Sequence, residues 1–135
     1  MNFFQWSPEY NTNVEIIDKQ HQRLVEIINE LYTAVMEIRG QEVIKGIIKS
    51  LVEYAVIHFR TEEEYMLKYD YPGYGENKKE HENFSARVAA LHAQAKNDEF
   101  ILSIDVLNFL KNWFQHHILE VDMQYKSFFK SKGVK

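Results

Sequence analysis

The segment of residues 41–68 decides the fold and reads QEVIKGIIKSLVEYAVIHFRTEEEYMLK. Its apolar residues recur at steps of three and four, as they do on the buried face of an α-helix. The same face ends in His58 and Glu62, which stand four residues apart and therefore share one side of the helix. Burying these two groups without partners would cost several kcal/mol, and metal coordination is one way to satisfy both. The rest of the chain must then supply the other ligands.

Three further helices follow from the same periodicity, at about residues 18–39, 77–96 and 103–130. We expect Gly40 to end the first of them, and the run Tyr69 to Gly75, with one proline and two glycines, to separate the second from the third. The fold class predicted is all-α, an antiparallel up-and-down four-helix bundle. Residues 18–130 form the bundle, residues 1–15 form an extended arm on its outside, and residues 1–135 make a single domain.

The composition narrows the function. The chain has 135 residues, no cysteine, 45% hydrophobic residues and a net charge of −4. An acidic chain offers no basic face to a phosphate backbone, so nucleic-acid binding is not expected. A signal peptide and a membrane-spanning run are both absent from the sequence, which predicts a cytoplasmic protein that does not bind membranes. Protein partners and oligomeric state are not readable from these features.

Polar residues on the inner faces come from all four predicted helices: His21, His58, Glu62, His81, His117 and, on the flank of the last helix, Asp122. Nitrogen and oxygen donors without thiolate, converging inside a bundle, suit two transition-metal ions with bridging carboxylates, iron or manganese before copper(I). Taken alone, a single histidine such as His21 is more simply interpreted as a hydrogen-bonded core residue than as a metal ligand. Six together would cost too much in desolvation without a metal. By contrast, His92 and His116 are interpreted as surface or flank histidines.

Three segments, taken in order, resemble the bacterial hemerythrins, which are single-domain relatives of the di-iron oxygen carriers. The first is Ile17-Asp18-Lys19-Gln20-His21 with Leu24 following, and the second runs from His58 through Glu62 to His81 and Phe84. The third holds Trp113, His117, Ile118, Asp122 and Tyr125. The resemblance covers nearly the whole sequence.

This resemblance implies a cofactor of two iron ions, bridged by an oxo or hydroxo group. One iron would be held by His21 and His58 and the other by His81 and His117, with Glu62 and Asp122 bridging them. Dioxygen would bind end-on as a hydroperoxide at one iron, in an apolar pocket lined by Leu24, Trp113 and Ile118. These three residues fit an ordinary position in the hydrophobic core equally well. The implied function is a dioxygen carrier, store or sensor, and not an enzyme.

One position departs from the family pattern. The family has a further histidine four residues before His81, and this chain has Asn77 there. An amide oxygen ligates iron weakly, so Asn77 would be a weak ligand or would leave a vacant position for water. Asn77-Lys78-Lys79-Glu80 also fits a helix N-cap followed by an acidic residue.

The vacancy keeps an alternative function open. Two irons with exchangeable positions favour oxidase, peroxidase-like or ferroxidase-like turnover over reversible oxygen binding. A third interpretation is an interaction domain with a vestigial metal site.

Overall fold

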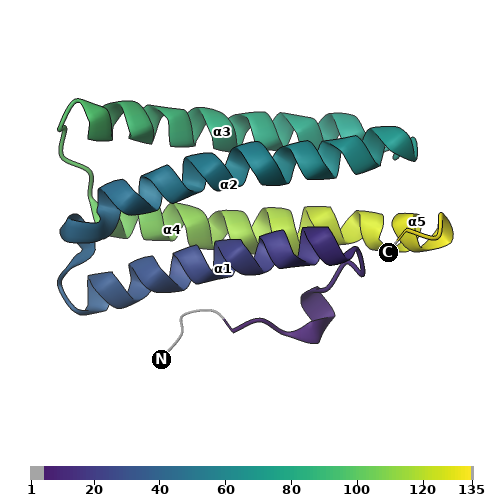
Figure 1. The fold of residues 1–135 in the computed structure, drawn as a ribbon, viewed down its shortest axis with the longest axis horizontal. Helices are drawn as coiled ribbons and strands as arrows, with labels where there is room; N and C mark the ends of the chain where they lie inside the picture. Colours follow the sequence, from purple (N-terminus) through teal and green to yellow (C-terminus); the bar gives the residue numbers. More distant parts are fainter. Residues whose placement is uncertain (1–4, 135) are drawn as a thin grey trace.

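A computed structural model describes residues 5–134, apart from the side chain of Val121. The first four residues of the predicted arm, with Phe3 and Phe4 among them, lie outside the described residues. The described part forms an up-and-down bundle of long helices, as predicted (Figure 1). The bundle helices are α1 (Glu15–Met36), α2 (Gly40–Lys68), α3 (Tyr74–Lys96) and α4 (Ser103–Trp113). Beyond α4 the last helix continues as η2 (Phe114–Val121), η3 (Asp122–Gln124) and α5 (Tyr125–Ser131).

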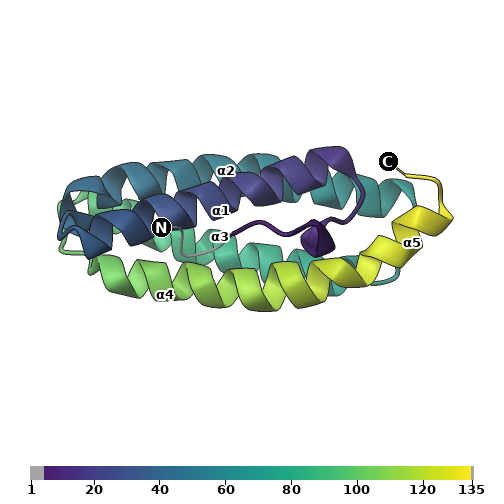
Figure 2. The same ribbon diagram turned by 90° about the horizontal axis from the view of Figure 1, so that it is seen from below.

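The arm contains one short 3-10 turn, η1 (Pro8–Tyr10), and lies on the outside of the bundle as predicted (Figure 2). The ring of Tyr10 meets the ring of Phe114 edge to face, with centroids 6.2 Å apart. The Asp18 carboxylate accepts hydrogen bonds from the Thr12 N–H at 2.6 Å, the Thr12 hydroxyl at 2.7 Å and the Asn13 N–H at 3.1 Å. These bonds tie the arm to the first turn of α1, which therefore begins at Glu15, three residues earlier than predicted.

The third helix also begins earlier than predicted, at Tyr74 instead of Asn77. Gly73 precedes its first turn, and the Asn77 N–H already donates to the Gly73 carbonyl at 3.1 Å. The interpretation of Asn77 as an N-cap is therefore wrong. Asn77 lies one turn inside α3, where its side chain is buried.

The prediction of Gly40 as a helix end is also wrong, because Gly40 is the first residue of α2. The left-handed residue that ends α1 is Ile38, at φ 59°. A glycine is needed at position 40 for space, because a Cβ there would lie 2.3 Å from the Ser103 Oγ. The close approach joins the start of α2 to the start of α4.

Continuous α-helix was expected from residue 103 to residue 130, and the structure corrects this as well. Residues Phe114–Val121 form a π-helical segment, which is followed by a 3-10 turn at Asp122–Gln124. Such segments hydrogen-bond from residue i to i+5, and they concentrate at functional sites. His117, Ile118 and Asp122 all lie in or directly after this segment.

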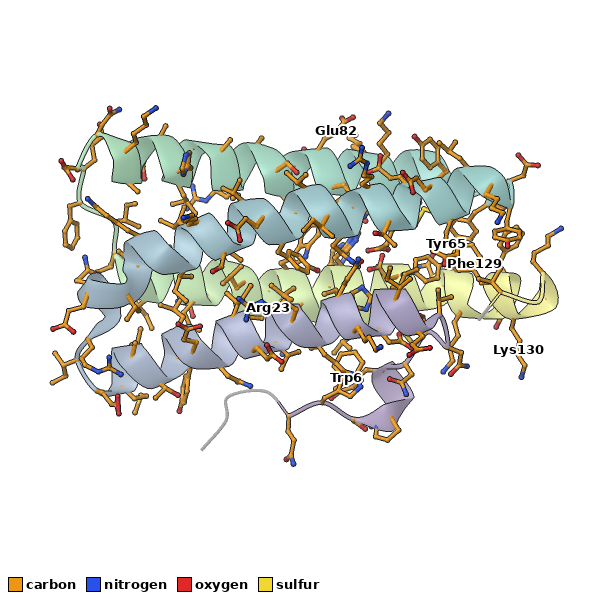
Figure 3. The ribbon with its side chains drawn as sticks, in the orientation of Figure 1. Trp6, Arg23, Tyr65, Glu82, Phe129 and Lys130 are labelled. Carbon is orange, nitrogen blue, oxygen red and sulfur yellow. The ribbon has the colours of Figure 1, made fainter. Side chains whose placement is uncertain are left out.

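Two apolar clusters fill the bundle. The larger runs through α1, α2, α3, α4 and η2, and the smaller gathers around Val14, Ile17, Met66, Tyr125 and Phe129 near α5. In Figure 3 the side chains of Tyr65 and Phe129 lie together at the α5 end, with ring centroids 6.2 Å apart. Members of the larger cluster flank His58 and His117 in sequence, and Glu62 stands between Phe59 of the larger cluster and Met66 of the smaller one. No helix in residues 5–134 has the length and apolar character that a membrane span requires.

Candidate metal centre

The structure brings all six of the predicted ligands together in the interior. His21 reaches inward from α1, His58 and Glu62 from α2, His81 from α3, His117 from η2 and Asp122 from η3. None of the six is more than 2% exposed. Because each helix of the bundle places at least one of them, the centre forms only when all four helices pack.

The six side chains form two overlapping groups. Within each group, the ligand atoms all lie within 4.8 Å of one another. One group holds His21, His58, Glu62 and Asp122, and the other holds Glu62, His81, His117 and Asp122. Both carboxylates belong to both groups. This is the arrangement that two neighbouring metal ions need if carboxylates are to bridge them.

Short contacts define the first group. The His21 Nε2 lies 3.2 Å from the Asp122 Oδ2 and 3.7 Å from the Glu62 Oε1. The His58 Nε2 is also in direct contact with the Glu62 Oε1. In the second group, the His117 Nε2 lies 3.0 Å from the Asp122 Oδ1 and 3.2 Å from the His81 Nε2. The Nε2 atoms of all four histidines thus face one another or the shared carboxylates.

The donor set fits metal ions better than it fits hydrogen bonding. Although these atoms lie close together, none of the following buried atoms makes a well-formed hydrogen bond among residues 5–134: the His21 Nε2, the His58 Nε2, the Glu62 Oε1 and both Asp122 carboxylate oxygens. Leaving such groups unpaired in the interior costs about 1–3 kcal/mol each and more where they are charged. Two divalent or trivalent cations would satisfy these atoms together.

Electrostatics couple the group tightly. Burial disfavours the charge on His21, but Asp122 and Glu62 outweigh that effect and raise the pKa of His21 to about 9. Burial is also the largest influence on His58 and lowers its pKa, against the opposing effect of Glu62. The pKa of Glu62 is well below its usual range, because His58 and His21 outweigh the effect of burial. Glu62 is therefore ionised and ready to accept a cation.

A second layer of polar residues orients the histidines, in roles that the sequence did not predict. The His58 Nδ1 lies 2.7 Å from the Gln20 Oε1, and the His81 Nδ1 lies 2.9 Å from the Glu63 Oε2. The Tyr125 hydroxyl donates to the Glu62 Oε2 at 2.9 Å. Hydrogen bonds of this kind fix which imidazole nitrogen faces a metal. Gln20 and Glu63 each stand beside a predicted ligand in sequence, which was the available signal.

The remaining predicted residues are placed as follows. Leu24, Trp113 and Ile118 are buried in the larger apolar cluster. Asn77 is also buried, and its Nδ2 donates to the Gly73 carbonyl at 3.2 Å while its Oδ1 has no partner among the described residues. His92 and His116 are exposed, as predicted.

Comparison with known proteins agrees with this geometry. A family model described as the hemerythrin HHE cation binding domain matches residues 12–129. A bacteriohemerythrin of Stenotrophomonas maltophilia is 32% identical over 127 residues, which cover 93% of this chain and 80% of that protein. A bacteriohemerythrin of Clostridium acetobutylicum is 31% identical, with 90% of this chain and 98% of that protein covered.

Solved structures show the same likeness. A wild-type hemerythrin crystal structure superimposes with a TM-score of 0.81 and 28% identity, covering 93% of this chain and 96% of that chain. A leucine-to-tyrosine variant of a hemerythrin gives a TM-score of 0.84 and 27% identity, covering 94% and 97%. Because the family model matches most of its length and relatives are more than 30% identical to it, this chain belongs to the hemerythrin family.

Proposed function

We propose that this chain is a non-haem di-iron protein that binds dioxygen reversibly, as a carrier, a store or a sensor. The observation that carries the proposal is the pair of buried ligand groups that share Glu62 and Asp122. Membership of the hemerythrin family supports its coarser part, a di-iron protein that binds dioxygen. Reversibility, the physiological role and the end-on hydroperoxide remain predictions.

In this proposal His21 and His58 would hold one iron and His81 and His117 the other, with Glu62 and Asp122 shared between the two sites. When bound, the two irons supply the electrons and the open coordination position that dioxygen needs. The chain's own part is to orient and to protect. Gln20 and Glu63 hold the rings of His58 and His81, and Tyr125 holds Glu62.

Leu24, Trp113 and Ile118 are proposed to keep water from the open position. Leu24 and Ile118 are fully buried, and the Trp113 ring stacks on the ring of His117 with centroids 4.1 Å apart. These apolar side chains keep water and protons out of the open position. Their exclusion slows irreversible oxidation of the iron. That is the property that distinguishes a carrier from an oxidase.

Asn77 favours a second candidate function. Its buried, unpartnered Oδ1 is available as a weak ligand, or it leaves a position for water at the iron held by His81 and His117. Two irons with exchangeable positions support oxidase, peroxidase-like or ferroxidase-like turnover. Repeated turnover with a reducing substrate would favour this enzyme over the carrier.

The test compares the wild-type protein with Asn77→His and, as a matched control, His92→Asn at the surface. Iron content and the visible spectrum under oxygen are measured for each protein, and the spectrum is measured again after oxygen is removed. We expect about two irons per chain, a colour that bleaches reversibly, and no change in His92→Asn.

Asn77→His is expected to bind the second iron more tightly and to slow autoxidation. Failure of the wild-type protein to load iron would overturn the proposal. Irreversible oxidation within seconds would reject the carrier, and identical behaviour of Asn77→His and wild type would show that position 77 does not limit the chemistry.

A further inference from the structure

Tyrosines gather at the α5 end of the bundle. Five of the eight tyrosines belong to the smaller apolar cluster or pack against it: Tyr65, Tyr69, Tyr71, Tyr74 and Tyr125. Tyr65 is labelled there in Figure 3, next to Phe129. Packing alone would be served as well by phenylalanine, which has no hydroxyl. A tyrosine ring can in addition give up an electron together with its hydroxyl proton and take both back.

Tyr125 is the innermost of these rings. It is fully buried, and its hydroxyl donates to the Glu62 Oε2 at 2.9 Å. Glu62 belongs to both ligand groups, so one hydrogen bond separates the Tyr125 ring from the carboxylate that the two sites share. Burial first, and then Asp122 and Glu62, hold the pKa of Tyr125 well above its usual range, so the hydroxyl keeps its proton.

Tyr71 connects Tyr125 with the surface. The two rings meet edge to face, with centroids 6.0 Å apart. Tyr71 lies between α2 and α3 and is partly exposed. Its ring lies against the backbone of Gly73, where a Cβ would be 2.6 Å from the Tyr71 Cε2. Two adjoining tyrosine rings therefore lead from Glu62 to solvent.

Positive charge surrounds the outer end of this path. The Lys132 Nζ lies 5.5 Å from the centre of the Phe128 ring, and the Phe128 ring lies 5.2 Å from the Tyr71 ring. Two more lysines stand over rings of the same cluster, Lys68 over Tyr69 and Lys78 over Tyr74. Residues 125–134 include three lysines and no acidic residue, in a chain whose net charge is −4. This surface therefore favours small anions over neutral molecules.

The buried metal centre needs such a path if it is to turn over repeatedly. None of the six candidate ligands is more than 2% exposed, so a reductant the size of a sugar acid does not touch the ligand atoms. We propose that Tyr125 and Tyr71 form an electron relay, through which an anionic one-electron donor at the surface reduces the centre without entering it. The inference rests on the second candidate function, peroxidase-like turnover. It adds the class of reducing substrate, small anions such as ascorbate, and the place where they deliver the electron.

The reaction balances with hydrogen peroxide as the oxidant and ascorbate as the donor. One hydrogen peroxide and two ascorbate monoanions give two water molecules and two ascorbyl radical anions, and the iron ends in the state in which it began. The O–O bond breaks, and two O–H bonds form with the two protons that ascorbate releases to solvent. The Tyr125 proton shifts along its hydrogen bond to Glu62 when the electron leaves, and it returns when Tyr71 supplies the next electron. Tyr71, which is partly exposed, exchanges its own proton with solvent.

The test follows ascorbate oxidation by hydrogen peroxide in the iron-loaded protein. Tyr71→Phe keeps the ring and removes the hydroxyl, and kcat is expected to fall about tenfold or more. Tyr125→Phe should have the same effect. Matched controls are Tyr65→Phe and Tyr69→Phe, whose rings lie against Phe129 with centroids 6.2 Å apart and whose kcat should change less than about twofold.

The charge of the surface is tested separately. Lys132→Gln should raise the KM for ascorbate and leave kcat unchanged, because the lysine attracts the donor and takes no part in the relay. The KM for hydroquinone, a neutral donor, should not change. An equal effect on both donors would overturn the anionic substrate class.

A spectroscopic readout does not depend on turnover. When iron-loaded protein is mixed with hydrogen peroxide without ascorbate and then frozen, electron paramagnetic resonance should show a tyrosyl radical. The signal of a partly exposed tyrosine should be absent from Tyr71→Phe and from Tyr125→Phe, and it should persist in the two controls. Loss of a merely structural contact would not remove a radical selectively.

Unchanged ascorbate oxidation and an unchanged radical signal in Tyr71→Phe would overturn the inference and would place electron entry elsewhere, such as the cavity that His58 lines. If Tyr125→Phe does not load iron, Tyr71→Phe decides alone. Iron-loaded wild-type protein that binds dioxygen reversibly but forms no radical with peroxide would overturn the relay and leave the proposed function standing. Failure to load iron would remove both.

Discussion

Single residues in the left-handed region end the long helices of this protein. Ile38, Asp70, Asp98 and Gly133 have φ values of 59°, 56°, 56° and 73° and follow the last turns of α1, α2, α3 and α5. At each of these helix ends two backbone hydrogen bonds close the turn. At the end of α1, for example, the Ile38 N–H donates to the Val35 carbonyl and the Arg39 N–H donates to the Ala34 carbonyl. This is a Schellman motif, which favours glycine at the left-handed position. Only Gly133 meets that preference, and Ile38, a β-branched residue, violates it most.

Ile38→Gly is therefore expected to stabilise the protein by about 1 kcal/mol, because it relieves the strained backbone. The Ile38 side chain is 94% exposed, so little packing is lost. The measurement is the free energy of unfolding in denaturant. Gly133→Ala is the matched control of opposite sign, because a Cβ there meets no atom within 4 Å and only the backbone strain changes. Destabilisation by Ile38→Gly would show that the isoleucine makes a stabilising contact.

At the scale of elements, the π-helical segment η2 explains a spacing that an α-helix does not. His117 and Asp122 stand five residues apart, which in an α-helix would separate them by about 140°. Hydrogen bonding from residue i to i+5 brings such positions onto one side of the helix. The structure accordingly places the His117 Nε2 3.0 Å from the Asp122 Oδ1.

The contact between the starts of α2 and α4 fixes how these two helices are placed. Gln41 bridges it, with its Nε2 donating to the Ile101 carbonyl at 2.8 Å and its Oε1 accepting from the Ser103 N–H at 3.1 Å. Beside that bridge a Cβ at Gly40 would lie 2.3 Å from the Ser103 Oγ and 2.9 Å from its Cβ. The two helix starts are therefore as close as a glycine permits.

Gly40→Ala is expected to destabilise the fold by about 1–3 kcal/mol, because the new methyl group overpacks this contact. Thermal or denaturant unfolding measures the effect. In the double variant Gly40→Ala/Ser103→Gly the clashing side chain is gone, so the combined cost should be smaller than the sum of the two single costs. Strict additivity would mean that the helices simply move apart.

For the whole molecule, the metal centre is part of the fold, since four helices each contribute to a buried set of charges. Iron that binds the native state alone adds about 3 kcal/mol per site at a free concentration of about 100 times its Kd. We expect removal of iron to lower the unfolding midpoint clearly. An unchanged midpoint would instead favour the interaction domain with a vestigial site.

The iron-free protein should also lose stability as the pH rises. His21 has its pKa raised from 6.5 to about 9 in the folded state, so its contribution is fully present below pH 6.5 and is lost as the pH rises through 9. The raised pKa of His117 changes the stability in the same direction. The lowered pKa of His58 instead reduces the stability as the pH falls below 6.5.

Denaturant unfolding of iron-free protein across this pH range measures the effect, and His21→Gln should flatten the curve. Iron binding should show the opposite trend and tighten with rising pH, because protons compete with the metal for the histidines. A flat curve for the iron-free wild-type protein would contradict the prediction.

The sequence alone determined the helical fold and gathered five of the six candidate ligands on inner faces, with Asp122 on the flank of the last helix, because a period of about 3.6 residues assigns each side chain to a face. Polar residues on an apolar face stand out. Helix ends were less predictable. Local turn chemistry placed the start of α3 at Tyr74, and the backbone of Ile38, not that of Gly40, ends α1.

Only the tertiary structure decided what depends on contacts between helices. It paired His58 with Gln20 and His81 with Glu63, it turned Asp122 toward His117 through η2, and it left Tyr54 and Trp113 without partners. A hydrogen bond across helices depends on their relative positions to within a few tenths of an ångström. Periodicity fixes the face of a residue, but it carries no information on that distance.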